Sequence, residues 1–152
     1  MIRPMILLLF LTAFTEESKA VASVSEVNCE EVVLEVSSEK GVYKGQVSYY
    51  GKRWDGRTTA NMEIYNSGLL TCASPTLPFN TIIEVTNMDT CEVIIVRVND
   101  RGPYKMDLKG RALRPLQAHP KRVLDLSRAA FDSIGNLDKG LLNVEYRVVG
   151  IE

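Results

Sequence analysis

The chain has 152 residues, of which 45% are hydrophobic and 24% are charged, and its formal net charge at pH 7 is −1. These fractions are close to those of globular domains and argue against a disordered chain. A net charge so close to zero gives no reason to expect a nucleic-acid partner, and we predict none.

The first 22 residues are predicted to be a secretory signal peptide. Arg3 supplies the positive charge, and an apolar run from Met5 to Phe14 follows it. This run is shorter than the roughly 20 apolar residues of a transmembrane helix. The small residues Ala20 and Ala22 suit cleavage after residue 22. An earlier cleavage site after residue 20 and an uncleaved anchor are the alternatives.

No stable membrane anchor is expected after cleavage. A lipoprotein signal would place a cysteine directly after the apolar run, whereas the first cysteine is Cys29, behind a polar stretch. About 130 residues remain, which is enough for one compact domain but not comfortably for two. We assign residues 23–44 to a glutamate-rich, acidic extension. Residues 45–152 are the predicted domain, which we expect to be a monomer.

From Gly41 onward, short β-branched and aromatic runs alternate with glycine, proline and asparagine, which is typical of an all-β domain. Two runs, 82–86 and 92–98, have a period of two and are joined by a turn-like segment, so we predict an antiparallel hairpin. One short helix is predicted between Ser127, as its cap, and Gly135. Six strands indicate a small barrel, with the strands at 45–50, 69–73, 81–86, 92–98, 122–126 and 143–149.

The three cysteines are Cys29, Cys72 and Cys91. After export they would lie in an oxidising compartment, where disulfides form. Pairing Cys72 with Cys91 would close a loop of about 20 residues and stabilise the fold by roughly 3 kcal/mol. We predict this disulfide, with Cys29 as the odd thiol. Three reduced cysteines are the alternative.

The segment Val96-Arg-Val-Asn-Asp-Arg-Gly-Pro103 runs from a strand into a polar turn. A carboxylate at a strand end, next to a rigid Gly-Pro turn, is held firmly and still faces a cleft, as a positioned acid must be. Asp100 is therefore a candidate catalytic acid. The alternative is that Asp100 stabilises the turn by accepting hydrogen bonds from backbone amides.

Two further features indicate carbohydrate binding. Tyr49 and Tyr50 offer flat faces and hydroxyls that suit sugar rings. Because strand alternation turns one of them inward, at least one is expected to belong to the core. Glu63 is a candidate second carboxylate, with a solvated loop glutamate as the alternative. No cofactor is predicted, and neither the lone His119 nor the cysteine spacing indicates a metal site.

Six short motifs occur in order along the chain. They are Gly45-Gln-Val-Ser-Tyr-Tyr-Gly51, Thr59-Ala-Asn-Met-Glu63, Thr76-Leu-Pro-Phe79, Val85-Thr-Asn87, Val96-Arg-Val-Asn-Asp-Arg-Gly-Pro103 and Leu124-Asp-Leu-Ser-Arg-Ala-Ala130. In order and near-spacing, over Gly45 to Val149, they resemble the RlpA (rare lipoprotein A) family. The resemblance implies a six-stranded double-psi β-barrel, a fold shared with expansins and barwin-like proteins. It also implies a bacterial periplasmic or cell-envelope protein that acts as an endolytic transglycosylase on peptidoglycan glycan strands, preferring strands without stem peptides.

The resemblance also implies roles for single residues. Asp100 matches the family's catalytic aspartate, which protonates the bond between N-acetylmuramic acid and N-acetylglucosamine. It then takes the proton of the C6 hydroxyl as a 1,6-anhydro ring forms. Glu63 matches an acidic residue of the cleft and is assigned to substrate positioning or to tuning of Asp100. The residues assigned to substrate binding are Ser48, Tyr49, Tyr50, Thr59, Asn61, Ser74, Asn99 and Arg101.

The chain departs from the family pattern at three cleft positions. Ser74 stands where the family has a histidine, Asn66 where it has an acidic residue, and Met62 where it has a glycine. The cleft is therefore poorer in titratable groups than those of its relatives, and the missing histidine at Ser74 favours the alternative function, a non-catalytic peptidoglycan-binding module in the manner of expansins. A protease-inhibitor or toxin-like barrel is compatible with the fold, because fold does not fix function, but nothing in the sequence favours it.

The stretch from Arg101 to Arg122 is longer than the usual family connection and rich in basic residues. It would bind anionic wall polymer or stem-peptide carboxylates, or else be a solvated loop. Its basic residues are Arg101, Lys105, Lys109, Arg111, Arg114, Lys121 and Arg122, against Asp107 alone.

Overall fold

The computed structural model describes residues 41–152. The predicted signal peptide, residues 1–22, therefore lies outside the described residues. So do residues 23–40 of the predicted acidic extension and the predicted unpaired thiol of Cys29.

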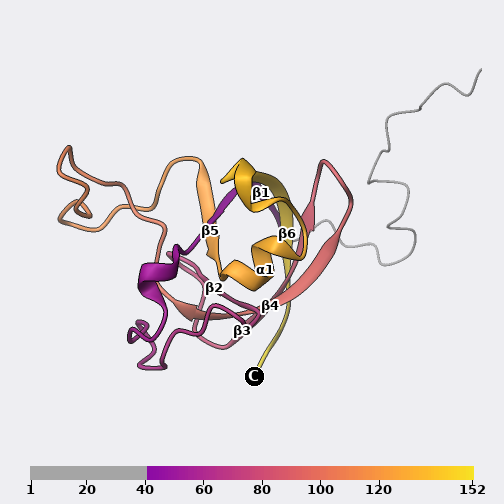
Figure 1. Cartoon of the computed structure of the whole chain (residues 1–152), viewed down its shortest axis with the longest axis horizontal. Coiled ribbons are helices and arrows are strands. Elements are labelled where there is room, and N and C mark those ends of the chain that lie inside the picture. Colours follow the sequence, from indigo (N-terminus) through magenta and orange to yellow (C-terminus); the bar gives the residue numbers. More distant parts are fainter. Residues whose placement is uncertain (1–40) are drawn as a thin grey trace, which may run out of the picture.

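Six strands close into a barrel, and one short α-helix lies beside them, so the predicted all-β fold with one helix is confirmed (Figure 1). Around the barrel the strands follow the order β1-β5-β2-β4-β3-β6. The strands are β1 (Val42–Tyr49), β2 (Thr71–Ala73), β3 (Thr81–Asn87), β4 (Val93–Asp100), β5 (Arg122–Leu126) and β6 (Leu142–Ile151).

The barrel mixes parallel and antiparallel pairs. β1 pairs with β5, and β2 with β4, in parallel, and the other neighbours are antiparallel. β3 and β4 form the predicted hairpin, with Ile83 opposite Val96. β6 pairs with β1 on one side and with β3 on the other, so this strand closes the barrel.

The strand bounds differ from prediction where pairing between distant segments decides them. β1 begins at Val42 rather than Gly45, because its pairing with β6 extends to Arg147 opposite Val42. β6 reaches Ile151, because it also pairs with Thr81 of β3. Such contacts leave no signal in the local sequence pattern.

Alternation along the strands builds the core. Every second residue of β3 is buried, as expected for a strand with one face toward the barrel interior. β4 has the same period from Ile94 to Val98. The interior is filled with large apolar side chains, which include the fully buried Phe131, Ile83, Leu124, Leu126, Ile134 and Leu142.

The predicted helix is α1 (Arg128–Asp132). Its cap is Ser127, as predicted, whose hydroxyl accepts a hydrogen bond from the backbone N–H of Ala130. The helix places Phe131 in the core. Within residues 41–152, no helix has the length and apolar character needed to cross a bilayer.

The predicted Cys72–Cys91 disulfide is wrong. Cys72 is a buried free thiol, and Cys91 is a disulfide-bonded cysteine. Cys72 lies opposite Val98, near the end of β4, whereas Cys91 precedes the start of that strand. At about 3.3 Å per residue, positions 91 and 98 are roughly 20 Å apart. A disulfide needs Cα atoms within about 7 Å, so the two thiols cannot meet.

The connection between β4 and β5, residues 101–121, extends away from the barrel as a long arm (Figure 1). The arm is folded back on itself, with isolated bridges between Tyr104 and Ala118 and between Met106 and Ala112. It begins beside the last residue of β4, Asp100, so its first residues lie next to the candidate acid.

Candidate active site

A cavity of about 530 Å³, a volume typical of small-ligand pockets, opens where the ends of β1 and β4 meet the arm. β1 and the residue after it supply Ser48, Tyr49 and Tyr50. β4 supplies Asp100, and β5 supplies residues 122 and 125. The other walls are the 3₁₀-helix η2 (Lys52–Trp54), the loop after it and the arm, through Arg53, Trp54, Arg57, Thr58, Thr59, Tyr65, Arg101, Gly102, Tyr104 and Met106.

Asp100 ends β4, and three donors hold its carboxylate. Oδ2 accepts a hydrogen bond from the hydroxyl of Tyr50 at 2.7 Å, and Oδ1 accepts from the backbone N–H groups of Ala60 and Arg101, each at 2.8 Å. The pairing of β2 with β4 is irregular here, and Ala73 lies opposite Asp100. Such irregularities re-aim a side chain at the end of a strand. Asp100 therefore both bonds backbone amides and lines the cavity.

Asp125 is a second carboxylate in the same cavity. It lies in β5 between two fully buried leucines, so strand alternation turns it away from the core and toward the cavity. Its Oδ1 accepts hydrogen bonds from the hydroxyl of Ser48 and from Nη1 of Arg122. Burial raises the pKa of Asp125, against the lowering effect of Ser48 and Arg122, and the nearby charge of Asp100 raises it further.

Tyr50 forms the wall between Asp100 and the outer aromatic residues. Its ring centroid lies 5.0 Å from that of Tyr65 and 6.2 Å from that of Trp54. Burial, together with the charge of Asp100, raises the pKa of Tyr50. The hydroxyl therefore stays protonated and remains a hydrogen-bond donor to Asp100.

Trp54 is the exposed end of this aromatic wall, with 38% of its surface open to solvent. The guanidinium groups of Arg53 and Arg57 lie 5.5 Å and 5.2 Å from the centroid of its ring, within the range of cation–π contacts. Backbone bonds fix this corner, since Arg57 N–H donates to the Trp54 carbonyl and Tyr65 N–H donates to the Arg57 carbonyl.

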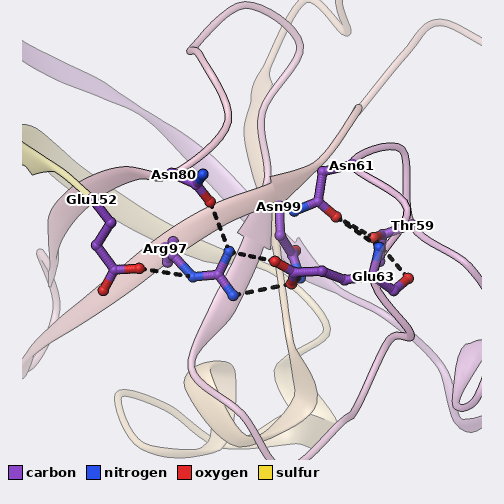
Figure 2. A network of polar contacts seen from close by, with 7 residues as sticks. All are labelled: Thr59, Asn61, Glu63, Asn80, Arg97, Asn99 and Glu152. Carbon is purple, nitrogen blue, oxygen red and sulfur yellow. Dashed lines mark hydrogen bonds and ion pairs between the residues drawn. The ribbon is translucent and has the colours of Figure 1, made fainter.

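Glu63 does not line this cavity and belongs to a polar network beside it (Figure 2). Its carboxylate accepts two hydrogen bonds from the guanidinium of Arg97, at 2.8 Å and 3.0 Å, and one from the side-chain amide of Asn99 at 3.0 Å. These bonds, first of all those from Arg97, lower the pKa of Glu63 to about 2. Asn80 and Glu152 bind the same guanidinium from its other side.

The loop of residues 59–63 connects this network with Asp100. The side-chain oxygen of Asn61 accepts hydrogen bonds from the hydroxyl of Thr59 at 2.6 Å and from the backbone N–H of Glu63 at 3.1 Å. The same loop carries Ala60, whose N–H bonds Asp100. Glu63 is thus linked to Asp100 through the backbone of this loop.

The structure brings together part of the predicted site. Of the two predicted catalytic residues, Asp100 lines the cavity, and Glu63 does not. The predicted substrate-binding residues that line it are Ser48, Tyr49, Tyr50, Thr59 and Arg101, and those that lie away from it are Asn61, Ser74 and Asn99.

Several of these residues have structural contacts of their own. The ring of Tyr49 packs on Phe131, so one of the paired tyrosines does contact the core, as predicted. The hydroxyl of the buried Ser74 accepts a hydrogen bond from Leu77 N–H at 3.1 Å. The guanidinium of Arg101 lies 3.7 Å from the ring centroid of Phe79.

The sequence prediction missed Asp125, Trp54 and the two arginines beside Trp54. A signal for Asp125 was present, because a lone carboxylate between two leucines of a predicted strand must face away from the core. Trp54 is the chain's single tryptophan. Tryptophan offers the largest aromatic face for stacking, and this one follows the predicted tyrosine pair closely.

The basic stretch 101–122 has fewer available cations than its composition indicates. Arg122 donates to Ser48 and pairs with Asp125, and Arg111 pairs with Asp107 at 3.0 Å. The guanidinium of Arg101 lies over the ring of Phe79 and donates to the backbone carbonyl of Leu77. Lys105 donates to Gln117 at 3.2 Å. Three cations of this stretch form no hydrogen bond or ion pair through their side chains within residues 41–152. They are Lys109, Arg114 and Lys121.

His119 has a structural contact at the end of the arm. Its Nδ1 accepts hydrogen bonds from the backbone N–H groups of Lys121 and Arg122, at 3.2 Å and 2.9 Å, where the arm enters β5. In the part of the chain that the structure describes, no three histidine, cysteine, aspartate or glutamate residues gather as metal ligands.

Known proteins resemble this chain in fold or in sequence. The closed barrel resembles the Streptomyces papain inhibitor with a TM-score of 0.53 over 73% of this chain and 96% of that one, at 21% identity, which shows the fold alone. Among curated proteins, the probable endolytic peptidoglycan transglycosylase RlpA of Treponema pallidum is 36% identical over 126 residues, 83% of this chain and 35% of that protein. The Vibrio cholerae endolytic peptidoglycan transglycosylase RlpA is 38% identical over 108 residues, 71% of this chain and 36% of that protein.

This chain thus spans little more than a third of the length of these relatives. Their similarity to it confirms the resemblance seen in the six motifs. The family model described as lytic transglycolase matches residues 42–146, which include all six strands up to the middle of β6 and every residue of the cavity. The barrel of residues 41–152 is a double-psi β-barrel, and the chain belongs to the lytic transglycolase family.

Proposed function

We propose that the chain is an endolytic lytic transglycosylase of peptidoglycan, with Asp100 as acid and base. One observation carries this proposal. The Asp100 carboxylate lines an open cavity and is fixed by three hydrogen bonds, in a chain of the lytic transglycolase family. A carboxyl group held this firmly has the orientation that proton transfer to a bound glycan requires.

The proposed reaction needs one proton donor and no water. Asp100, in its acid form, gives its proton to the oxygen that joins N-acetylmuramic acid to N-acetylglucosamine. The bond from this oxygen to the anomeric carbon breaks, and the N-acetylglucosamine side leaves as an alcohol. The C6 hydroxyl of the muramic residue then bonds to the anomeric carbon, and its proton returns to the Asp100 carboxylate. Ordinary glycoside hydrolysis differs, because it uses a second carboxyl group and water.

Asp125 and Tyr50 support this chemistry. The transition state of glycosidic cleavage carries positive charge near the anomeric carbon, which a second carboxylate in the cavity stabilises when ionised. Asp125 lines the same cavity as Asp100, and Ser48 and Arg122 hold it there. Tyr50 donates to Asp100 and fixes the direction of its carboxyl group.

Glu63 is proposed as a positioning residue. It does not line the cavity, but the bonds from Arg97 hold it in place, and its own backbone belongs to the loop that presents Ala60 N–H to Asp100. Replacing Glu63 would therefore misplace one of the three donors to Asp100. This agrees with the predicted tuning of Asp100, without direct contact between the two carboxylates.

The test is a digest of peptidoglycan glycan strands without stem peptides by the purified protein. The products are examined by mass spectrometry for 1,6-anhydro ends. The wild-type protein is expected to release them, and Asp100→Asn to lower the rate by about a hundredfold or more, as for loss of a general acid. Circular dichroism of the variant controls for folding. A wild-type protein that releases no anhydro product would refute the proposal.

A second candidate is binding of the glycan without cleavage. One observation favours it, since three of the roughly four acceptor sites of the Asp100 carboxylate already take hydrogen bonds, and only one, on Oδ2, is left to carry a proton. Sedimentation with insoluble peptidoglycan, with no soluble product at any protein concentration, would identify this function.

For either function we propose that the protein is a monomer exported to the periplasm or cell envelope, where its glycan lies. Fractionation of cells that express the full chain, followed by immunodetection, tests the location. Sedimentation equilibrium tests the monomer.

A further inference from the structure

The rim of the cavity carries two arginine side chains that form no ion pair with any carboxylate of residues 41–152. The guanidinium groups of Arg53 and Arg57 both line the cavity. Within residues 41–152, neither forms a hydrogen bond or an ion pair through its side chain, and both guanidinium groups lie over the ring of Trp54. Arginine presents a planar fork of donors that matches a carboxylate, so this pair is available for an anionic ligand.

The rim and the floor of the cavity have opposite character. Asp100 and Asp125 lie at the floor, where their charges disfavour any anionic group, whereas η2 and the loop after it place Arg53, Arg57 and an exposed indole at the mouth. A neutral polysaccharide would gain from the indole and can accept hydrogen bonds from the guanidinium groups, but it offers no charge to match theirs. A sugar with an acidic substituent can bind with its ring on Trp54 and its carboxylate toward the arginines, away from the floor.

We infer that Arg53, Trp54 and Arg57 form a subsite for a sugar ring that carries a carboxylate. The inference rests on the proposed glycan function and names the substrate feature that this chain selects. Trp54 supplies the exposed part of its indole as an apolar contact for the sugar ring, and Arg53 and Arg57, which lie beside it, supply charge-assisted hydrogen bonds. In peptidoglycan the carboxylate comes from one of two sources, the free lactyl group of muramic acid in strands without peptides, or the stem peptide in strands that carry them.

Rigid backbone supports this subsite. The carbonyl of Trp54 accepts from Arg57 N–H at 3.0 Å, and the residues around Arg57 pair with Tyr65, whose ring contacts Tyr50 of the floor. The distance between the stacking face and Asp100 is thereby fixed through packed aromatic rings. A sugar held at the rim sets which glycosidic bond reaches the acid.

Binding, rather than cleavage, tests the subsite, and Asp100→Asn serves as the background so that no substrate is consumed. The probes are peptide-free glycan strands, the same strands with their carboxyl groups amidated by carbodiimide and ammonia, and peptide-bearing strands. Peptide-free strands are expected to bind at least about tenfold more tightly than their amidated form, because two charge-assisted hydrogen bonds are lost. Tighter binding of peptide-bearing strands would assign the carboxylate to the stem peptide.

Variants separate the charges from the ring. Arg53→Gln with Arg57→Gln is expected to remove the preference for untreated over amidated strands, whereas Arg53→Lys with Arg57→Lys keeps part of it. Trp54→Ala is expected to weaken both kinds of strand to a similar degree. The matched control is Lys109→Gln with Arg114→Gln, which removes the same charge from exposed positions outside the cavity, and should preserve the preference.

Equal affinity for untreated and amidated strands would overturn the inference. So would loss of the preference in the control variant but not in the Arg53 and Arg57 variant, since the arm would then be the anion site. These outcomes are independent of the anhydro-product assay. Discrimination without product would leave the subsite standing and refute the lyase, and product without discrimination would do the reverse.

Discussion

The hydroxyl of Tyr50 donates to Oδ2 of Asp100 at 2.7 Å, and burial keeps that hydroxyl protonated by raising the pKa of Tyr50. Tyr50 directly follows β1 and Asp100 ends β4, and these strands are not neighbours in the barrel, so the contact joins two separate parts of the cavity wall. The position of the candidate acid therefore depends on a side chain as well as on its own strand.

Tyr50→Phe should slow release of anhydro products by about tenfold, because one hydrogen bond to a charged group is worth roughly 1.5–3 kcal/mol and two donors to Asp100 remain. The rate is measured under saturating glycan. The control is Tyr43→Phe in β1, which is stacked against Tyr146 and lies outside the cavity, and it should keep the wild-type rate. Equal rates for both variants and the wild type would contradict the role of Tyr50.

Asp125→Asn should show a pH-dependent effect on stability together with a loss of activity. The folded-state pKa of Asp125 is raised above its usual 3.8, mainly by burial, so folding favours its neutral form. Its contribution to stability is fully present below pH 3.8 and declines as the pH rises through the raised pKa. The unfolding free energy of the wild type relative to Asp125→Asn should therefore decline from pH 3 to pH 7, as measured by urea titration. A difference that grows with pH would contradict this account.

Glu63→Gln should have the opposite pH dependence. The pKa of Glu63 is lowered from 4.5 to about 2, chiefly by its bonds from Arg97, so its contribution to stability is present above pH 4.5 and is lost as the pH falls through about 2. The wild type should unfold at higher urea concentration than Glu63→Gln at pH 6, and the two midpoints should converge toward pH 2. Midpoints that stay apart at pH 2 would show that the ionised carboxylate is not what the network needs.

Cys72 should react with thiol reagents only after unfolding. It is a buried free thiol, and burial, reinforced by the charge of Asp125, raises its pKa. The reactive thiolate is therefore scarce in the folded protein. Labelling at pH 8 followed by mass spectrometry should leave Cys72 unmodified in buffer and modify it in urea. Rapid labelling without urea would place this thiol at an accessible surface.

The strands, the hairpin and the helix were predictable because each depends on a local pattern. The alternation of β3 and the cap at Ser127 are written in consecutive residues, and the structure repeats them. The disulfide was not predictable in this way, because loop length says nothing of which end of β4 each cysteine lies near. Motif order identified the family, although no local rule gives the pairing of β6 with both β1 and β3.

The site was predictable for Asp100 and its tyrosine, and less so for the second carboxylate. Sequence alone favoured Glu63, but Arg97 captures it in the folded chain through a contact across 34 positions. Asp125 reaches the cavity instead, because the parallel pairing of β1 with β5 brings it beside Ser48. Such strand pairings form only in the closed barrel. A sequence motif can therefore suggest a catalytic carboxylate but cannot show which carboxylates lie close to Asp100.

The double pairing of β6 has a consequence for the growing polypeptide. On a ribosome, β1 emerges first among the six strands and β6 last, and β1 and β3 each lack one partner until β6 follows. The barrel can close only when nearly the whole domain has been translated, so the closed fold is completed late. Contacts between such distant segments also slow folding. A chain stalled before residue 142 would hold two open seams at once, and these are the sites where a chaperone or a protease would act first.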